Sequence, residues 1–154
     1  MSKLNASVKE ILKKYVSIGH LLELFPGSDN DSIEFFHSIT HSDVVAIGDE
    51  NLESSHLEYY KQRVPPYPLH LKKFDYIFLN EAEWLVYVEF GGPVNFGKFP
   101  AETIRFIDKN LKKNGRFIIS NIHIAVADII KEWMNQQGYY SFFYENSVAI
   151  FTKL

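Results

Sequence analysis

Apolar residues follow two different patterns along this chain, and the patterns predict strands and helices in turn. Short continuous apolar runs predict buried strands at 21–25, 43–47, 74–79 and 116–120. Apolar residues at every third or fourth position predict helices at 5–18, 31–40, 52–62, 101–113 and 126–137. Because strands that are apolar on both faces are typical of a parallel sheet covered on both sides, the chain is predicted to have an α/β fold.

The two ends of the chain depart from this alternation. The helix at about 5–18 is amphipathic and precedes the first strand. At the other end, segments 139–144 and 147–152 predict two strands joined at Glu145-Asn146, which fits a hairpin turn. We therefore expect residues 1–154 to form one domain. Its predicted core is a three-layer, doubly wound, mostly parallel sheet with a C-terminal antiparallel hairpin.

Two segments give a weaker signal. Three prolines lie within 63–70, so any third strand is predicted there to be short or missing. Residues 84–90 fit either a strand or a helical turn, and the glycine-rich segment 90–97 follows. The position of this glycine-rich segment after a central strand suits a lid over a substrate. If residues 84–90 instead form an edge strand with alternating apolar residues, that edge would suit a homodimer contact.

Composition limits the partners and the compartment. The formal net charge of −3 and the isoelectric point near 6.1 give no strong signal for binding nucleic-acid phosphates. The absence of cysteine excludes disulfides and thiolate chemistry. No stretch approaches the ~20 apolar residues that span a bilayer, and no secretory signal is evident. We expect a cytoplasmic protein that does not bind membranes and has a small-molecule ligand.

The stretch LLELFPGSDND, residues 21–31, has the order of a strand, a glycine turn and the start of a helix. It contains one glycine, Gly27, followed by Asp29 and Asp31. Carboxylates suit the first turn of a helix, but they occupy the place where a pyrophosphate would bind. This turn therefore argues against a dinucleotide or a nucleoside triphosphate and tolerates a cationic ligand.

The order of elements resembles the class I S-adenosylmethionine-dependent methyltransferases, over about residues 21–154. Four stretches carry the resemblance: LLELFPGSD, VVAIGDEN, FDYIFLN and IDKNLKKNGRFIIS. In that family the first is an acidic residue and a glycine-rich turn, and the second is a strand that ends in an acid. The last two resemble the fourth strand and the helix, turn and fifth strand that follow it.

The resemblance implies S-adenosylmethionine as the cofactor and places six residues beside it: Glu23, Phe25, Gly27, Asp49, Glu50 and Asn80. Glu23 would face the ammonium group of the ligand, and Gly27 would allow the backbone to approach it closely. Asp49 or Glu50 would accept hydrogen bonds from the ribose hydroxyls. Both acids would lie at the carboxyl ends of the strands, where open α/β sheets bind ligands.

Phe25 and Asp29 stand where the family has its other two glycines. Pro26 favours an extended Phe25, because the residue before a proline is biased away from the helical region. An extended Phe25 would share a face with Glu23 and would partly occlude the cofactor's place. The alternative is that the turn rotates the Phe25 ring into the core.

The histidines give no clear catalytic residue. Glu34, His37 and His41 share one face of a predicted helix, and the spacing of the two histidines suits a metal chelate. No third ligand is evident, so we expect a solvent-exposed face and no metal site. His123 follows a core strand at the predicted ligand edge and is the best placed of the remaining histidines to act as a base.

Two functions follow from the sequence. One is an S-adenosylmethionine-dependent enzyme that methylates a small molecule or another acceptor. The other is a methyltransferase-like domain that lacks catalysis and serves as a binding or assembly module. The fold by itself does not separate them.

Overall fold

A computed structural model of the chain describes residues 4–64, 66–82 and 98–154. Four helices and seven strands occur in the described part: α1 (Ala6–Tyr15), β1 (Leu21–Leu24), α2 (Asp31–Thr40), β2 (Val44–Gly48), β3 (Leu57–Lys61), β4 (Phe74–Asn80), α4 (Lys98–Asn110), β5 (Leu111–Ser120), α5 (Ile124–Gln137), β6 (Tyr140–Glu145) and β7 (Val148–Lys153). The segments 84–90 and 90–97, for which the sequence suggested an edge strand and a lid, lie outside the described residues.

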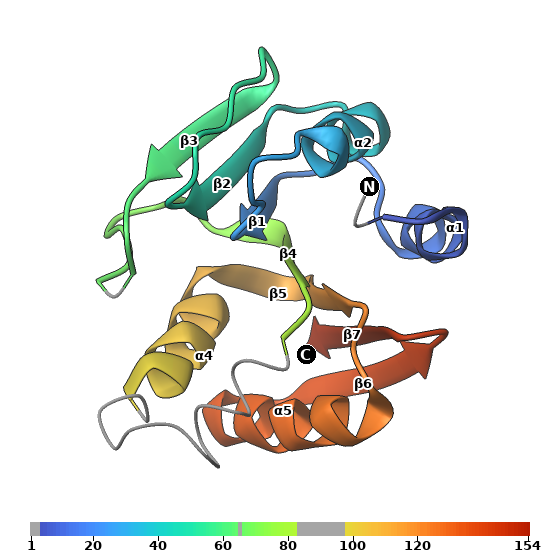
Figure 1. Cartoon of the computed structure of the whole chain (residues 1–154). Coiled ribbons are helices and arrows are strands. Elements are labelled where there is room, and N and C mark those ends of the chain that lie inside the picture. The colour runs from blue at the N-terminus through green and yellow to red at the C-terminus, as the bar shows by residue number, and fades with distance from the viewer. Residues whose placement is uncertain (1–3, 65, 83–97) are drawn as a thin grey trace.

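The seven strands form one sheet in the order β3-β2-β1-β4-β5-β7-β6. The first five pair in parallel, and β7 is antiparallel to both β5 and β6. Helices α1 and α2 cover one face of the sheet, and α4 and α5 cover the other (Figure 1). The predicted three-layer, mostly parallel fold with a C-terminal antiparallel hairpin is therefore confirmed.

Each face of the sheet has its own hydrophobic cluster. On the α4 and α5 side, Leu22, Leu24 and Ile47 are fully buried. On the α1 and α2 side, Leu21 and Phe36 are buried to the same degree or nearly so. The continuous apolar runs of β1 and β2 exist because alternate residues enter different clusters and neither face reaches solvent.

The predicted helix at 52–62 is wrong, because the structure has the edge strand β3 there. Backbone pairing with β2 over the whole of Leu57–Lys61 determines this outcome. Tyr59 and Tyr60 favour a pleated, half-buried surface, which an edge strand provides. The third strand thus lies before the proline-rich segment and not within it, so that expectation is also corrected.

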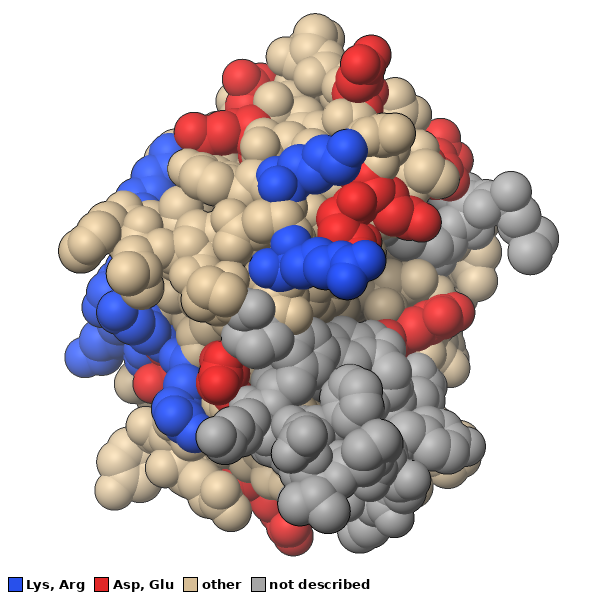
Figure 2. Space-filling view, turned by 60° about the vertical axis from the view of Figure 1, so that its left-hand side comes forward, with Lys and Arg blue, Asp and Glu red and all other residues tan. Residues whose placement is uncertain are grey.

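Among the described residues, no helix is long and apolar enough to cross a bilayer. The face shown in Figure 2 carries acidic and basic side chains interspersed on its described part. That distribution matches the small net charge of the sequence.

The predicted turn at Asn114-Gly115 lies within β5, at an irregularity in the pairing of β5 with β4, and it is tightly packed. Asn114 has a φ of 67°, a left-handed conformation that asparagine tolerates. A Cβ on Gly115 would lie 2.7 Å from the carbonyl oxygen of Lys112 and 3.0 Å from that of Asp75. Both neighbours are backbone atoms, so neither can move aside without shifting the strands.

We predict that Gly115→Ala lowers the free energy of unfolding by about 1–3 kcal/mol, the usual cost of overpacking. The control is Gly138→Ala, because Gly138 has an extended φ of 178° and the nearest atom to an added Cβ lies 3.7 Å away. Urea denaturation followed by circular dichroism measures both variants. Equal stability of the two variants would show that this turn is not as confined as the structure indicates.

Candidate functional site

The carboxyl ends of β1, β2, β3 and β4 meet at one edge of the sheet. The strand order switches direction between β1 and β4, since β2 and β3 lie on one side of β1 while β4 and β5 lie on the other. In open parallel sheets, ligands bind outside the carboxyl ends of the strands at this switch. The candidate site is built from the residues that immediately follow these strands.

The turn after β1 begins with a left-handed residue. Phe25 has a φ of 55°, and Gly27 has a φ of 77°. The extended Phe25 expected from Pro26 is therefore wrong. Two contacts offset the strain: the Phe25 amide donates to the carbonyl oxygen of Ile47 at 2.8 Å, and the ring packs against the cluster on the α4 and α5 side.

Packing at the end of β2 explains the position of its acidic residue. A Cβ on Gly48 would lie 3.0 Å from the Tyr59 hydroxyl oxygen and 3.3 Å from Cδ of Pro26. The last residue of β2 is thus confined between the turn after β1 and the edge strand β3. The first acid that can reach the surface is the next residue, Asp49, which is exposed.

A pocket of about 240 Å³ opens where β1, β2 and β3 end. It is lined by Phe25, Asp49, Gln62, Arg63 and Val64. The left-handed turn places the Phe25 ring in the wall of this pocket. Asp49 supplies a carboxylate and Val64 an apolar surface, which is the mixture found in small-molecule sites.

Acidic and basic side chains both lie near this edge, because Arg63 lines the pocket together with Asp49. Burial, then the carboxylates of Asp49 and Glu50, raise the pKa of the Tyr59 hydroxyl. Protonated Tyr59 donates to the carbonyl oxygen of Glu50 at 2.6 Å. An added Cβ on Gly27 would lie 3.2 Å from Oε2 of Glu50, so this carboxylate lies beside the turn after β1.

Glu23, expected beside the ligand, is completely buried. Its two carboxylate oxygens accept from the hydroxyl of Ser32 at 2.7 and 3.0 Å. Ser32 lies in the first turn of α2, so the pair ties the end of β1 to the start of that helix. Glu23 is not among the residues that line the pocket, and its position indicates a role in holding the turn.

Asn80 lies at the carboxyl end of β4. Its side-chain oxygen accepts from the Ser120 hydroxyl at 2.7 Å and from the side-chain amide nitrogen of Asn121 at 2.6 Å. These bonds fix the Asn80 side chain against the end of β5. It lies on the same edge of the sheet as the pocket but is not part of the pocket lining.

The N-cap residue of α2 is Asn30, whose side chain makes no capping bond, and the acid before it takes part instead. Oδ1 of Asp29 accepts from the backbone amide of Asp31 at 3.0 Å. A carboxylate therefore occupies the helix N-terminus, which disfavours a phosphate there. His123, considered as a base, instead caps α5, because its Nδ1 accepts from the Ala125 amide at 3.1 Å.

The sequence did not indicate the pocket residues Gln62, Arg63 and Val64. They follow β3, whereas the misassigned helix at 52–62 contained Gln62 and left Arg63 and Val64 in a proline-rich connection. The two adjacent tyrosines of β3 were the available signal, because aromatic residues are enriched in strands.

The fold occurs in known structures of methyltransferases. A methyltransferase from Pyrococcus furiosus has a TM-score of 0.61 at 15% identity, with 94% of this chain and 81% of that chain covered. The N-methyltransferase NodS from Bradyrhizobium japonicum, solved with S-adenosyl-L-homocysteine, has a TM-score of 0.62 at 12% identity, with 97% and 88% covered. A precorrin 8w decarboxylase from Methanobacterium thermoautotrophicum has a TM-score of 0.61 at 14% identity, with 97% and 90% covered.

No protein-family model matches the sequence, and no sequence match to a curated protein is significant. The similarity therefore concerns the fold. The chain has the class I methyltransferase-like fold, as the resemblance of its sequence implied.

We predict that Ser32→Ala lowers the free energy of unfolding by about 1–3 kcal/mol, because it removes a hydrogen bond from a buried carboxylate. Ser38→Ala is the matched control in the same helix, since the Ser38 hydroxyl donates to the Phe35 carbonyl oxygen at an exposed position. Urea denaturation compares the two. If the free energy of unfolding falls by the same small amount in both variants, the Glu23–Ser32 pair does not hold the turn.

Proposed function

We propose that this chain binds S-adenosylmethionine, with the adenosine end of the cofactor in the pocket between Asp49 and Val64. The observation that carries the proposal is the exposed Asp49 carboxylate at the end of β2, on the wall of a pocket at the switch point. A carboxylate at this position in a doubly wound fold accepts hydrogen bonds from ribose hydroxyls.

The residues present fit the adenosine end of the cofactor. Phe25 and Val64 give the pocket apolar surface for a base, and Asp49 gives it an acceptor for hydroxyl groups. At about 240 Å³ the pocket is smaller than the ~300–1,000 Å³ of a typical ligand site. It therefore suits the nucleoside and not the whole cofactor.

The methionine end would lie along the turn after β1. Gly27, with its positive φ, gives that turn a position without a side chain. Glu50 and Asp29 place negative charge beside it, which suits an ammonium and a sulfonium group. Glu23 would act indirectly, by fixing the turn through Ser32.

When bound, the cofactor supplies an activated methyl group. The contribution of the protein would then be to hold that group in line with an acceptor, which is catalysis by proximity and orientation. We infer a small molecule as the acceptor, with Asn80 fixed at the edge where it would enter.

One observation favours the alternative of a non-catalytic binding module. Phe25 replaces the glycine of the family pattern, and the ring adds bulk where the cofactor passes close to the backbone. The ring packs against the core cluster while also lining the pocket. We propose that it forms a wall of the pocket and does not fill it.

Asp49→Ala is predicted to weaken binding of S-adenosylhomocysteine by about 1–3 kcal/mol, because the ribose hydroxyls lose a charged acceptor. Isothermal titration calorimetry measures the affinity. Asp128→Ala is the control, since Asp128 is an exposed acid on α5 and lies outside this pocket. Unchanged affinity in Asp49→Ala would remove the proposed role of this carboxylate, and no binding by the parent chain would remove the proposed cofactor.

The variant Phe25→Ala tests whether the Phe25 ring lines the pocket or fills the place of the cofactor. If the ring is a wall, its loss removes apolar contact from the ligand and weakens binding by about 1–2 kcal/mol. If the ring fills the cofactor's place, the same substitution increases affinity. Calorimetry with S-adenosylhomocysteine distinguishes the two, and Phe143→Ala on the exposed side of β6 controls for loss of an aromatic ring elsewhere. Increased affinity would contradict the proposal that the parent pocket is open.

A further inference from the structure

The amino ends of β2 and β3 bring together three side chains that the proposed cofactor site does not use. His37 lies in the last turn of α2, Asp43 immediately precedes β2, and His56 immediately precedes β3. The backbone holds these segments in place, because the Val44 amide donates to the His56 carbonyl oxygen at 2.8 Å. The cluster is thus at the opposite edge of the sheet from the pocket.

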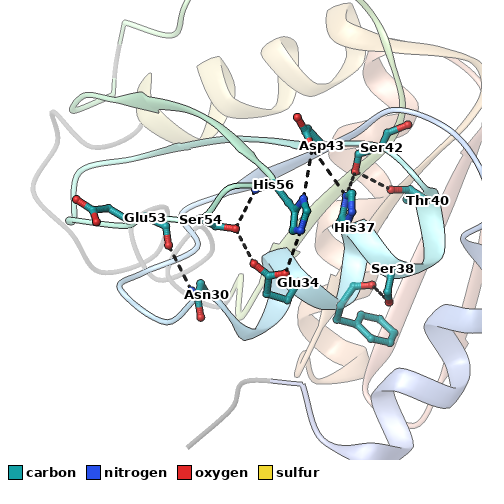
Figure 3. A network of polar contacts seen from close by, with 11 residues as sticks. Asn30, Glu34, His37, Ser38, Thr40, Ser42, Asp43, Glu53, Ser54 and His56 are labelled. Atoms are coloured by element: carbon teal, nitrogen blue, oxygen red, sulfur yellow. Dashed lines mark hydrogen bonds and ion pairs between the residues drawn. The ribbon is translucent and has the colours of Figure 1, made fainter.

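The three side chains converge (Figure 3). The two imidazole rings stack with centroids 3.7 Å apart and planes at 7°. Oδ1 of Asp43 lies 3.9 Å from Nδ1 of His37 and 3.8 Å from Nδ1 of His56. One donor atom from each residue lies within 4.8 Å of the other two.

This donor set is that of a zinc-class ion. Zn²⁺ takes imidazole nitrogen at ~2.0–2.1 Å and carboxylate oxygen at ~2.0–2.2 Å, so tetrahedral ligands stand roughly 3.3–3.5 Å apart. The distances of 3.8 and 3.9 Å between donor atoms exceed this by about half an ångström. All three side chains are partly exposed, at 31%, 65% and 38% for His37, Asp43 and His56, so they have room to rotate.

Two features must change when an ion binds. The lone pairs of imidazole lie in the ring plane, so the stacked rings must turn apart to share one ion. Nδ1 of His37 lies 2.9 Å from the carbonyl oxygen of Ser42, which requires a proton on that nitrogen in the free protein. Binding through this nitrogen displaces the proton and moves the N–H to Nε2.

A carboxylate lies beside the far nitrogen of His56. Oε2 of Glu34 lies 3.9 Å from Nε2 of His56, on the side of the ring away from Asp43. Glu34 is itself held, because the Ser54 hydroxyl donates to its Oε1 at 2.6 Å. At 3.9 Å Glu34 is too far from His56 for a hydrogen bond, so it adds negative charge near a bound ion without fixing the ring.

The pairing differs from the one that the sequence suggested. His41, four residues after His37, is the exposed left-handed residue that ends α2, with a φ of 59°. It is not part of the cluster, and Asp43 and His56 stand beside His37 instead. The spacing of histidines within one helix therefore pointed to the wrong partner.

We propose that His37, Asp43 and His56 form a binding site for a divalent transition-metal ion of the zinc class. The ion would join the end of α2 to the starts of β2 and β3 and would stabilise the edge strand β3. Because the site lies at the amino edge of the sheet, it is independent of the proposed cofactor pocket.

Calorimetric titration of the untagged, EDTA-treated chain with ZnCl₂ tests the site. We expect saturable binding of one ion, with affinity at least tenfold lower in His56→Ala and in Asp43→Asn. His56→Ala keeps the backbone bond to Val44, and Asp43→Asn preserves the shape of the side chain, so both variants are expected to fold. His41→Asn is the matched control, because asparagine also tolerates a positive φ.

A second readout locates the ion. Co²⁺ should give visible absorption bands with the parent chain and His41→Asn, and these bands should be lost in His56→Ala. The proposal is overturned if the parent shows no saturable binding, or if His56→Ala binds Zn²⁺ as tightly as the parent. It is also overturned if His41→Asn loses the affinity, because the ion would then bind to a different pair. Circular dichroism verifies that each variant is folded.

Discussion

The buried carboxylate of Glu23 fixes the turn on which the candidate site depends. It lies one residue before the end of β1 and accepts from the Ser32 hydroxyl of α2 through both oxygens, which ties the strand to the helix. In the turn between them, Phe25 is left-handed and Cδ of Pro26 lies against Gly48. Crowding at Gly48 then leaves Asp49 as the first residue of the next connection that can face solvent.

The sequence predicted the parts of the fold whose residues are buried on both sides. The runs in β1, β2 and β4 are apolar because each strand contributes to both clusters, as β5 and β7 also do. The edge strand β3 was not predicted, because it pairs on one side only and its residues are exposed or half-buried. Its spacing of apolar residues fits a helix equally well, and pairing with β2 decides between the two.

In the candidate site, too, the residues that follow buried strands could be predicted and those that follow the edge strand could not. Asp49 and Glu50 could be located from the sequence because an acid after a buried strand must lie at the sheet edge. The pocket residues Gln62 to Val64 follow β3, so their position depends on where that strand ends. They were not predicted because β3 was not predicted. The conformation of Phe25 also depends on tertiary contacts, since the local effect of Pro26 favours the opposite outcome. For the same reason, His56 could not be paired with His37 before β3 was placed.

The two edges of the parallel sheet have different chemistry. The carboxyl edge has a pocket with an exposed acid, and the amino edge has two stacked histidines with a carboxylate beside both. Structures with this fold include methyltransferases and a precorrin 8w decarboxylase, so the fold does not define the reaction. The residues at the carboxyl edge are therefore the ones that support a cofactor.

The most direct test is a titration with S-adenosylhomocysteine followed by ¹H–¹⁵N correlation spectra of the labelled chain. We predict that the amide signals of Phe25, Asp49 and Gln62 to Val64 shift first and saturate together, while those of Asp43 and His56 do not move. Shifts that cluster away from the ends of β1, β2 and β3, or no shifts at high ligand concentration, would contradict it.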